Sequence, residues 1–301
     1  MKKPSIRKIL PCSDSEDVSA WDKIAKIANE TPAKEILKLI EYDINPQVVK
    51  TELGEKWLVV TDVHRPFHNV KLWDKLLQLI RNLGSDLTGF ILGGDYLDLF
   101  SLGKYNEESV YLLKDIDLEE EYADGLKGIE ELESVLHKNT KKYFLFGNHE
   151  DRYFRALKTR DNAKFGAALK NPVTALHLIT KGWEVKTDWK EDYFNITQDL
   201  IVLHGKYCGQ NPTSSHAKNL PMSNIFGHTH RWGAYNFHGK KSYNIGGLYD
   251  KESKFFKYVD WVTRLNWENG FCIVDVLPDK TYFVNMVECK NDSFLVDGVV
   301  Y

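Results

Sequence analysis

Five short segments of this chain place aspartate, histidine or asparagine directly after an apolar run. They are "TDVH" (61–64), "GGDYLD" (93–98), "GNHED" (147–151), "LHG" (203–205) and "GHTH" (227–230). Carboxylate, imidazole and amide ligands without any thiolate suit divalent metals of intermediate hardness. The pair His228 and His230 is weak evidence alone, because short histidine pairs also occur in ordinary polar loops. The five segments together predict a metal site.

These segments contain more ligands than the three or four that a single catalytic zinc ion uses. Two ions fit better, with one carboxylate between them. Ions about 3.5–4 Å apart can hold both the attacking and the leaving oxygen of a phosphoryl transfer. His228 and His230 can face one point only if the backbone turns sharply between them, and we expect Gly227 to permit that turn.

The elements that must position these side chains alternate between strand and helix. Apolar runs predict five strands, at residues 57–60, 89–92, 142–146, 199–205 and 223–226. Amphipathic spacing predicts a helix at 69–83. The acidic stretch 107–138 reads as one or two helices, most convincingly at 118–136, and its glutamates read as a solvated face. This order is typical of an α/β fold with a largely parallel sheet. In such sheets ligands bind beyond the carboxyl ends of the strands, where the five segments would converge.

The remaining segments complete the expected architecture. Residues 150–182 read as mostly helical. Residues 233–247 and 269–289 alternate with turn signals, as antiparallel strands that close a second sheet would. Residues 1–50 differ from the rest, with helical spacing around Trp21 and Ile36. We interpret 1–50 as a short helical extension, more a packing arm than a helix-turn-helix appendage, and 51–301 as the main domain.

Composition narrows the function classes. The 301 residues are 43% hydrophobic, which is ample for a large core, and the net charge of −3 provides no global field for a polyanion. The four cysteines are scattered and form no C-x-x-C pair, which suits a reducing compartment. No apolar run approaches the roughly 20 residues that span a bilayer, and the basic amino terminus lacks the apolar segment of a secretory signal. We therefore expect a cytoplasmic protein without a membrane partner.

The ordered series D-x-H, G-D-x-x-D, G-N-H-[ED], H-G and G-H-x-H resembles the calcineurin-like metallophosphoesterase superfamily. Each block is weak alone, but all five occur in the order of the family, within residues 57–247. The resemblance implies an α/β fold, in which a two-sheet sandwich is flanked by helices. It also implies phosphoester hydrolysis at two divalent ions.

The resemblance further implies a role for each matching residue. The first ion would be bound by Asp62, His64 and His230. The second ion would be bound by Asn148, His204 and His228. Asp95 would bridge the two ions.

His149 would not bind a metal in this family. It would face the leaving-group oxygen as an acid or as a stabiliser of the phosphate. Asp98 would accept a hydrogen bond from His149 and fix its tautomer, which also makes physical sense on its own. The alternative role of Asp98 is a helix N-cap.

The expected chemistry is attack of a metal-bridged hydroxide on phosphorus, because two dications lower the pKa of a shared water molecule by many units. No cysteine lies in a metal block, and no residue needs to act as a covalent nucleophile. We expect Mn²⁺ as the ion, with Fe, Zn, Ni and Co as alternatives.

The substrate class rests on charge. Protein serine/threonine phosphatases continue G-D-x-x-D with arginine, whereas this chain continues with Leu99. We therefore predict phosphodiesters, of the nucleotide or nucleic-acid type, over phosphomonoesters or phosphoproteins. Candidate substrate residues are Arg65, Arg152, His216 and Lys218. The basic residues of 149–160 would form either a solvated helix face or a phosphate track.

A protein-interaction scaffold without catalysis is the alternative of another class. Such family members usually lose the catalytic histidine or a metal ligand. This chain retains His149 and all seven ligand positions. The sequence predicts no particular protein partner.

Overall fold

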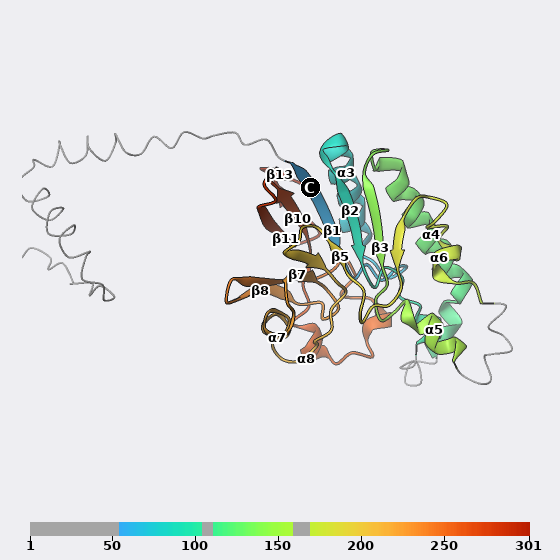
Figure 1. Ribbon diagram of the computed structural model, residues 1–301. Coiled ribbons are helices and arrows are strands. Elements are labelled where there is room, and N and C mark those ends of the chain that lie inside the picture. Colours follow the sequence, from blue (N-terminus) through green and yellow to red (C-terminus); the bar gives the residue numbers. More distant parts are fainter. Residues whose placement is uncertain (1–53, 104–110, 159–168) are drawn as a thin grey trace, which may run out of the picture. The chain divides into compact units, whose positions relative to one another are not determined.

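The five apolar runs of the sequence form strands that are divided between two sheets (Figure 1). The structure is a computed structural model that describes residues 54–103, 111–158 and 169–301. The helices expected within residues 1–50 lie outside these ranges. The described residues belong to one unit that spans Glu52–Tyr301.

The first sheet is mixed. Its order is β11 (Tyr282–Cys289), β10 (Asn269–Val276), β1 (Glu55–Val60), β2 (Gly89–Gly93), β3 (Lys141–Leu145) and β4 (Glu184–Lys186). The strands β1 to β4 are parallel, whereas β10 is antiparallel to β1 and to β11.

The position of β10 and β11 corrects the expectation that residues 269–289 close the second sheet. They extend the first sheet, with Val59 opposite Cys272. The physical reason is that β10 is apolar on both faces. Phe271 lies in the core under the helices, and its neighbour Cys272 lies in the core between the sheets. A strand buried on both faces fits a sheet that is covered on both sides.

The second sheet also combines parallel and antiparallel pairs. Its order is β5 (Phe194–Asn195), β6 (Leu200–Val202), β7 (Ser223–Phe226), β9 (Lys240–Ile245) and β8 (Trp232–Phe237). The strands β6, β7 and β9 are parallel, and β5 and β8 form antiparallel edges. A small ribbon of β12 (Leu295–Val296) and β13 (Val299–Val300) follows near the carboxyl end.

Alternate residues of the central strands build two separate cores. Val59 and Ile91 point towards the second sheet and pack with Val202 and Ile225. Leu58 and its alternate neighbours point the other way, towards the helices. The two-residue period of a strand therefore produces a sandwich with helices on its outer side, as predicted, and the α/β two-sheet fold is confirmed.

Two long helices cover the outer face of the first sheet (Figure 1). The helix α3 (Val70–Leu83) starts at Asn69, whose side chain accepts the N–H of Leu72. The helix α4 (Leu118–Val135) starts with a capping box made by Asp117 and Glu120. The range of α3 agrees with the prediction, and α4 coincides with the part of 107–138 that the sequence marked most clearly, whereas 107–110 lie outside the described residues. No helix in the described part of the chain is long and apolar enough to cross a membrane.

The other helices are short. They are α5 (Asp151–Leu157), α6 (Pro172–Ala175), α7 (Pro212–Asn219) and α8 (Trp261–Arg264), with 3-10 turns η1 (Gly84–Asp86), η2 (Phe100–Leu102) and η4 (Lys254–Phe256). The expectation of a mostly helical 150–182 is too broad for the part that is described, since 159–168 lie outside it and 176–182 follow the end of α6 as turns. Asn171 caps a new helix at Pro172, and β4 begins at Glu184.

One glutamate of α4 contradicts the solvated face that the sequence indicated. Glu121 is fully buried and accepts hydrogen bonds from the backbone N–H groups of Phe100 and Ser101 and from the Ser101 hydroxyl. Glu121 thereby holds the start of η2, which begins after Leu99, in place. The sequence pattern does not reveal this role, because most of the partners of Glu121 are backbone groups of another segment.

Candidate metal centre

The carboxyl ends of β1, β2, β3, β6 and β7 bring the five predicted segments together. Asp62, His64, Asp95 and Asn148 follow strands of the first sheet, and His204, His228 and His230 follow strands of the second. Within the described residues, three groups of side chains could each hold a metal ion, since their ligand atoms lie within 4.8 Å of one another. The groups are Asp62 with His64 and His230, His64 with Asp95 and His149, and Asp95 with His204 and His228.

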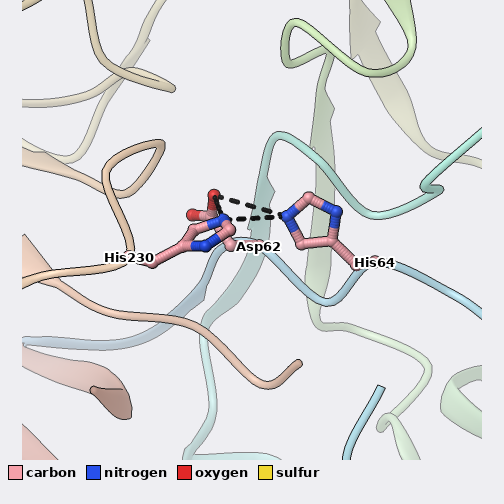
Figure 2. Close-up of side chains that lie close together, drawn as sticks. All are labelled: Asp62, His64 and His230. Carbon is pink, nitrogen blue, oxygen red and sulfur yellow. Dashed lines mark hydrogen bonds and ion pairs between the residues drawn. The ribbon is translucent and has the colours of Figure 1, made fainter. Parts of the chain in front are cut away.

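The first group converges on one point (Figure 2). The Nε2 atoms of His64 and His230 lie 2.9 Å apart, and Nε2 of His230 lies 3.2 Å from Oδ1 of Asp62. On its other side His64 places Nδ1 2.9 Å from Oδ2 of Asp98. That contact leaves Nε2 of His64 directed at the group, as a metal ligand requires.

The group of Asp95, His204 and His228 lies next to Asn148. Nε2 of His204 lies 2.9 Å from Oδ1 of Asn148 and 3.2 Å from Oδ2 of Asp95. The same Oδ2 lies 3.9 Å from Nε2 of His64. Asp95 therefore lies between the group of Asp62, His64 and His230 and the side chains of His204 and Asn148.

Five of these residues have a left-handed backbone. The φ angles are positive at Asp62, His64, Asp95, His228 and His230, between 50° and 64°. Such conformations are unfavourable for residues other than glycine and cluster at functional sites. The surrounding fold holds the strained loops in place.

Gly227 has a different function from the one we expected. The turn between His228 and His230 uses positive φ at the histidines themselves. A Cβ on Gly227 would lie 1.8 Å from Oδ2 of Asp62 and 2.4 Å from Oγ1 of Thr61. The glycine is therefore required for close approach of the Asp62 carboxylate, which accepts the N–H of His228 at 2.9 Å.

Glu150 ties two of the metal loops together. It is fully buried and accepts the backbone N–H groups of Asp95, Leu97 and Gly147 at 2.8–3.0 Å. Burial, with the charge of Asp95 nearby, raises its pKa to about 7. Sequence reasoning quoted this residue within "GNHED" but gave it no role.

The catalytic candidates His149 and Asp98 also lie at this edge. Nδ1 of His149 is 2.8 Å from the backbone carbonyl oxygen of Asp98 and 3.4 Å from its carboxylate. The carboxylate lies closer to His64 than to His149. Asp98 thus contacts His149 mainly through its carbonyl, and it caps no helix.

The electrostatics follow from burying opposite charges together. Burial opposes charge on His64, but hydrogen bonds with Asp62 and Asp98 raise its pKa to about 10. Burial likewise opposes charge on His204, yet Asp95 raises its pKa to about 9. Burial also opposes ionisation of Asp95, but His204 and His149 hold its pKa well below the usual range.

The other three histidines of the centre, His149, His228 and His230, have lowered pKa values. Burial and the nearby His204 lower the pKa of His228 to about 4. Burial and Arg152 lower the pKa of His149. Neutral imidazole is the form that binds a metal ion. Among the described residues, Nδ1 of His228 and Nδ1 of His230 are buried without a hydrogen-bond partner in the structure. The donor set and its geometry therefore fit divalent ions.

A cavity of about 290 Å³ opens at this centre. Its floor and walls are formed by residues from several loops, namely Asp95, Asn148, His149, Cys208, His228, Thr229, His230, Arg231, Tyr258, Val259, Thr263 and Trp267. A larger cavity of about 420 Å³ contains none of the predicted ligands, and we assign the chemistry to the smaller one because the ligands converge there.

The aromatic side of the site was not predicted. The ring of His230 stacks on Tyr249 and meets the edge of Trp267, with ring centroids 4.4 and 4.3 Å apart. Tyr249 also donates its hydroxyl to the carbonyl of His230. These residues follow the last motif, and nothing in their sequence pattern marks them.

The four residues that the sequence suggested for substrate binding lie in different places. Arg152 contacts His149 and Asp98. Arg65 is buried against Trp73 and pairs with Asp124, so it does not reach the cavity lining.

The other two candidates, His216 and Lys218, belong to the helix α7. His216 stacks on Phe226, and its Nε2 accepts the N–H of Lys206. Lys218 lies over Tyr235 and Phe237. Neither lines the cavity.

Comparisons with known proteins identify the family. Residues 56–243 match the calcineurin-like phosphoesterase family, whereas no curated protein matches the chain. Wild-type Vps29 from Entamoeba histolytica, complexed with Zn²⁺, is 14% identical, with 82% of this chain and 96% of that chain covered at a TM-score of 0.41. An archaeal phosphodiesterase is 15% identical over 77% and 99%, at 0.39. The phosphoesterase YfcE from E. coli is 16% identical over 78% and 100%, at 0.38.

The family match covers more than half of the chain and contains all seven predicted ligand positions. The protein therefore belongs to the calcineurin-like phosphoesterase family and is a hydrolase that acts on phosphoester bonds.

Proposed function

We propose that this protein is a phosphodiesterase that uses two divalent ions, with Mn²⁺ preferred, on a nucleotide or nucleic-acid substrate. The observation that carries the proposal is the shared position of Asp95. Its carboxylate belongs to the group with His204 and His228 and to the group with His64 and His149. A carboxylate placed between two sets of ligands suits a bridging role.

The ligands divide between the two ions as the family pattern implies. Asp62, His64 and His230 would hold one ion. Asn148, His204 and His228 would hold the other. The two ions, when bound, would neutralise charge on the phosphoryl oxygens. They would also lower the pKa of a water molecule, so that hydroxide is available to attack phosphorus near neutral pH.

The role of His149 rests on its location. It lines the cavity, and its Nε2 lies 3.8 Å from Oδ2 of Asp95. A ring in this position can contact the leaving-group oxygen of an ester bound at the same floor. Asp98 would orient His64 through its carboxylate and His149 through its carbonyl oxygen.

The arginines of the site favour a diester. A monoester brings nearly two negative charges, which require free positive groups. Arg152 is already paired with Asp98, at 3.2 Å. Arg231 lines the cavity and keeps its charge, since one of its terminal nitrogens donates only to the neutral carbonyl oxygens of Gly209 and Gln210. The single charge of a diester matches this supply better.

The proposal includes a cytoplasmic location. Cys272 and Cys289 are free thiols that are buried in the described part of the chain. Free thiols of this kind suit a reducing compartment.

Metal reconstitution tests the function. The protein is stripped with a chelator, dialysed and supplied with single ions, and turnover of bis(p-nitrophenyl) phosphate is compared with that of p-nitrophenyl phosphate. Both esters release the same phenol, so their ratio reports how the site handles charge. We expect turnover only with metal, highest with Mn²⁺, and a higher kcat/KM for the diester.

Two results would contradict the proposal. Full turnover by the metal-free protein would exclude metal-dependent chemistry. A strong preference for the monoester would overturn the substrate class. A protein that binds ions yet turns over neither ester would instead support the scaffold alternative.

A further inference from the structure

Arg231 is the only lysine or arginine among the described residues that line the cavity of the metal centre. It directly follows the candidate ligand His230 and is half-buried. Within the described lining, the only carboxylate belongs to Asp95, which already faces His64 and His204. The described part of the chain provides no carboxylate partner for Arg231. The cavity therefore contains one permanent positive charge that no carboxylate of the described protein neutralises.

The side chain of Arg231 is held in one orientation. Its terminal nitrogen Nη1 donates to the carbonyl oxygen of Gly209 at 3.1 Å and to that of Gln210 at 2.9 Å. The backbone carbonyl oxygen of Arg231 accepts the N–H of Gly246 at 3.0 Å. Gly209 and Gln210 lie between β6 and α7, in the segment that also contributes Cys208 to the cavity. The guanidinium is therefore fixed between the loops that follow β6 and β7.

These contacts use only one side of a planar group of donors. Nη1 carries two hydrogens, and the two carbonyl oxygens provide an acceptor for each. The edge formed by Nε and Nη2 has no hydrogen-bond partner within the described residues. Parallel N–H groups on such an edge match two oxygens of a phosphate. Because the guanidinium is already oriented, an anion that binds this edge has little side-chain entropy to overcome.

We propose that Arg231 is a specificity residue that binds a second phosphate group of the substrate, next to the phosphate that is hydrolysed. The assignment rests on the proposed function, in which the two ions would hold the phosphate under attack and meet its charge. The charge of Arg231 is then left for a neighbouring phosphate. This second phosphate is either the next diester of a nucleic-acid strand or a terminal phosphate of a nucleotide, and both offer the same oxygens.

Matched thymidine nucleotides test the assignment. TpT contains one phosphate, pTpT and TpTp add a terminal phosphate at one end or the other, and TpTpT adds a second diester. Cleavage between nucleosides is followed by chromatography in the presence of Mn²⁺, and each kcat/KM is divided by the value for TpT. We expect wild type to give a ratio of about 10 or more for at least one longer substrate, because charge-assisted hydrogen bonds are the strong ones. For TpTpT the ratio must exceed the factor of two that its second cleavable bond provides.

Three variants divide the role of the charge from that of the fork. Arg231→Gln removes both, and we expect every raised ratio to fall to about one. Arg231→Lys keeps the charge without the fork, so its ratio should be intermediate. Arg81→Gln is the matched control, since Arg81 is exposed in the last turn of α3 and does not line the cavity. It should keep the wild-type ratios. Losses common to all substrates cancel in these ratios, so a merely structural role of Arg231 would leave them unchanged.

Salt dependence provides a readout that needs no substitution. Added NaCl should lower the raised ratio of wild type, because ions screen the attraction between the guanidinium and the second phosphate. The ratio of Arg231→Gln should not respond, since TpT and the longer substrates then bind through the same groups.

The outcomes separate the two sources and the two hypotheses. A ratio raised for TpTpT alone identifies a neighbouring diester, whereas one raised for pTpT or TpTp identifies a terminal phosphate. Wild-type ratios near one, or raised ratios that persist in Arg231→Gln, would refute the assignment alone. So would a wild type that cleaves bis(p-nitrophenyl) phosphate but none of the four nucleotides. Absence of turnover on all five substrates would refute the proposed function, and this assignment with it.

Discussion

Asp95 and His149 lie next to each other yet should respond differently to substitution. Oδ1 of Asp95 accepts the backbone N–H of His149, and its other oxygen faces His204 and His64. His149 lies within reach of His64 and Asp95, although the family pattern does not make it a metal ligand. We propose that the Asp95 carboxylate binds metal and that the His149 imidazole acts on the substrate.

Asp95→Asn should lower the metal content of the purified protein more than His149→Ala does. If Asp95 bridges two ions as proposed, the substitution removes one negative charge from between two dications. His149→Ala should keep its metal while losing about 10²–10⁴-fold in turnover of an ester with a poor leaving group. Elemental analysis of both variants decides the matter, and equal metal loss would refute the division of roles.

Gly227 allows a second test at the level of a single atom. Gly227→Ala adds a methyl group 1.8 Å from Oδ2 of Asp62, so the carboxylate must move. We expect loss of metal and a stability decrease of about 1–3 kcal/mol, because overpacking forces side chains and backbone to shift. Gly209→Ala is the matched control, since nothing lies within 4 Å of its Cβ position. Similar metal content and melting temperature in the two variants would contradict the close-approach argument.

At the scale of elements, the buried Glu121 of α4 makes the free energy of unfolding depend on pH. Burial, with the charge of Asp98, raises the pKa of Glu121 to about 7, above its ordinary value of 4.5. A raised carboxyl pKa means that the folded protein favours the protonated form. The stabilisation that this gives is fully present below about pH 4.5 and is lost as the pH rises through about 7.

The free energy of unfolding of wild type should therefore fall, relative to Glu121→Gln, between pH 4.5 and pH 7. The expected change is on the order of 2 kcal/mol. Urea unfolding of metal-free wild type and variant at several pH values measures it, and the subtraction cancels groups common to both proteins. Glu119→Gln, at an exposed position of the same helix, controls for the loss of a glutamate. A wild type that gains stability over the variant with rising pH would contradict the sign.

The elements also explain which parts of the fold the sequence could predict. Strand ends that run into Asp, His or Asn are local patterns, and so is the helical spacing of α3. The sheet that β10 joins is a non-local choice, because it depends on which partner covers each face. Likewise, nothing in the pattern of α4 marks Glu121, whose partners belong to a loop about 20 residues away.

The site divides in the same way. The motif order marks the residues that the structure brings together at one edge, because their types and spacing carry chemistry. The contacts of Arg152 with Asp98 and of Tyr249 with His230 depend on loop conformation. Arg65 shows the limit of sequence position as evidence. It adjoins a metal block and was a candidate for substrate binding, while its guanidinium pairs with Asp124 and Glu131.

At the scale of the whole molecule, the metal centre lies across the seam between the two sheets. Asp62, His64 and Asp95 follow strands of the first sheet, whereas His228 and His230 follow β7 of the second. Ions bound there would join two halves that otherwise meet through the apolar core around Val59 and Ile225. The ions would thus stabilise the contact between the two sheets in addition to their part in catalysis.

Thermodynamic linkage turns this geometry into a measurable quantity. A ligand that binds only the folded protein adds about 2.7 kcal/mol of stability at a concentration about 100 times its Kd. The melting temperature should therefore climb with Mn²⁺ concentration and fall with chelator, in His149→Ala as in wild type, because that variant keeps the ligands. Asp95→Asn should show a much smaller climb. A melting temperature that does not change with metal would mean that the ions do not stabilise the two sheets against unfolding. If the ions do stabilise them, a shortage of metal would lower the amount of folded protein as well as its activity, and the supply of ions would determine how much folded hydrolase is present.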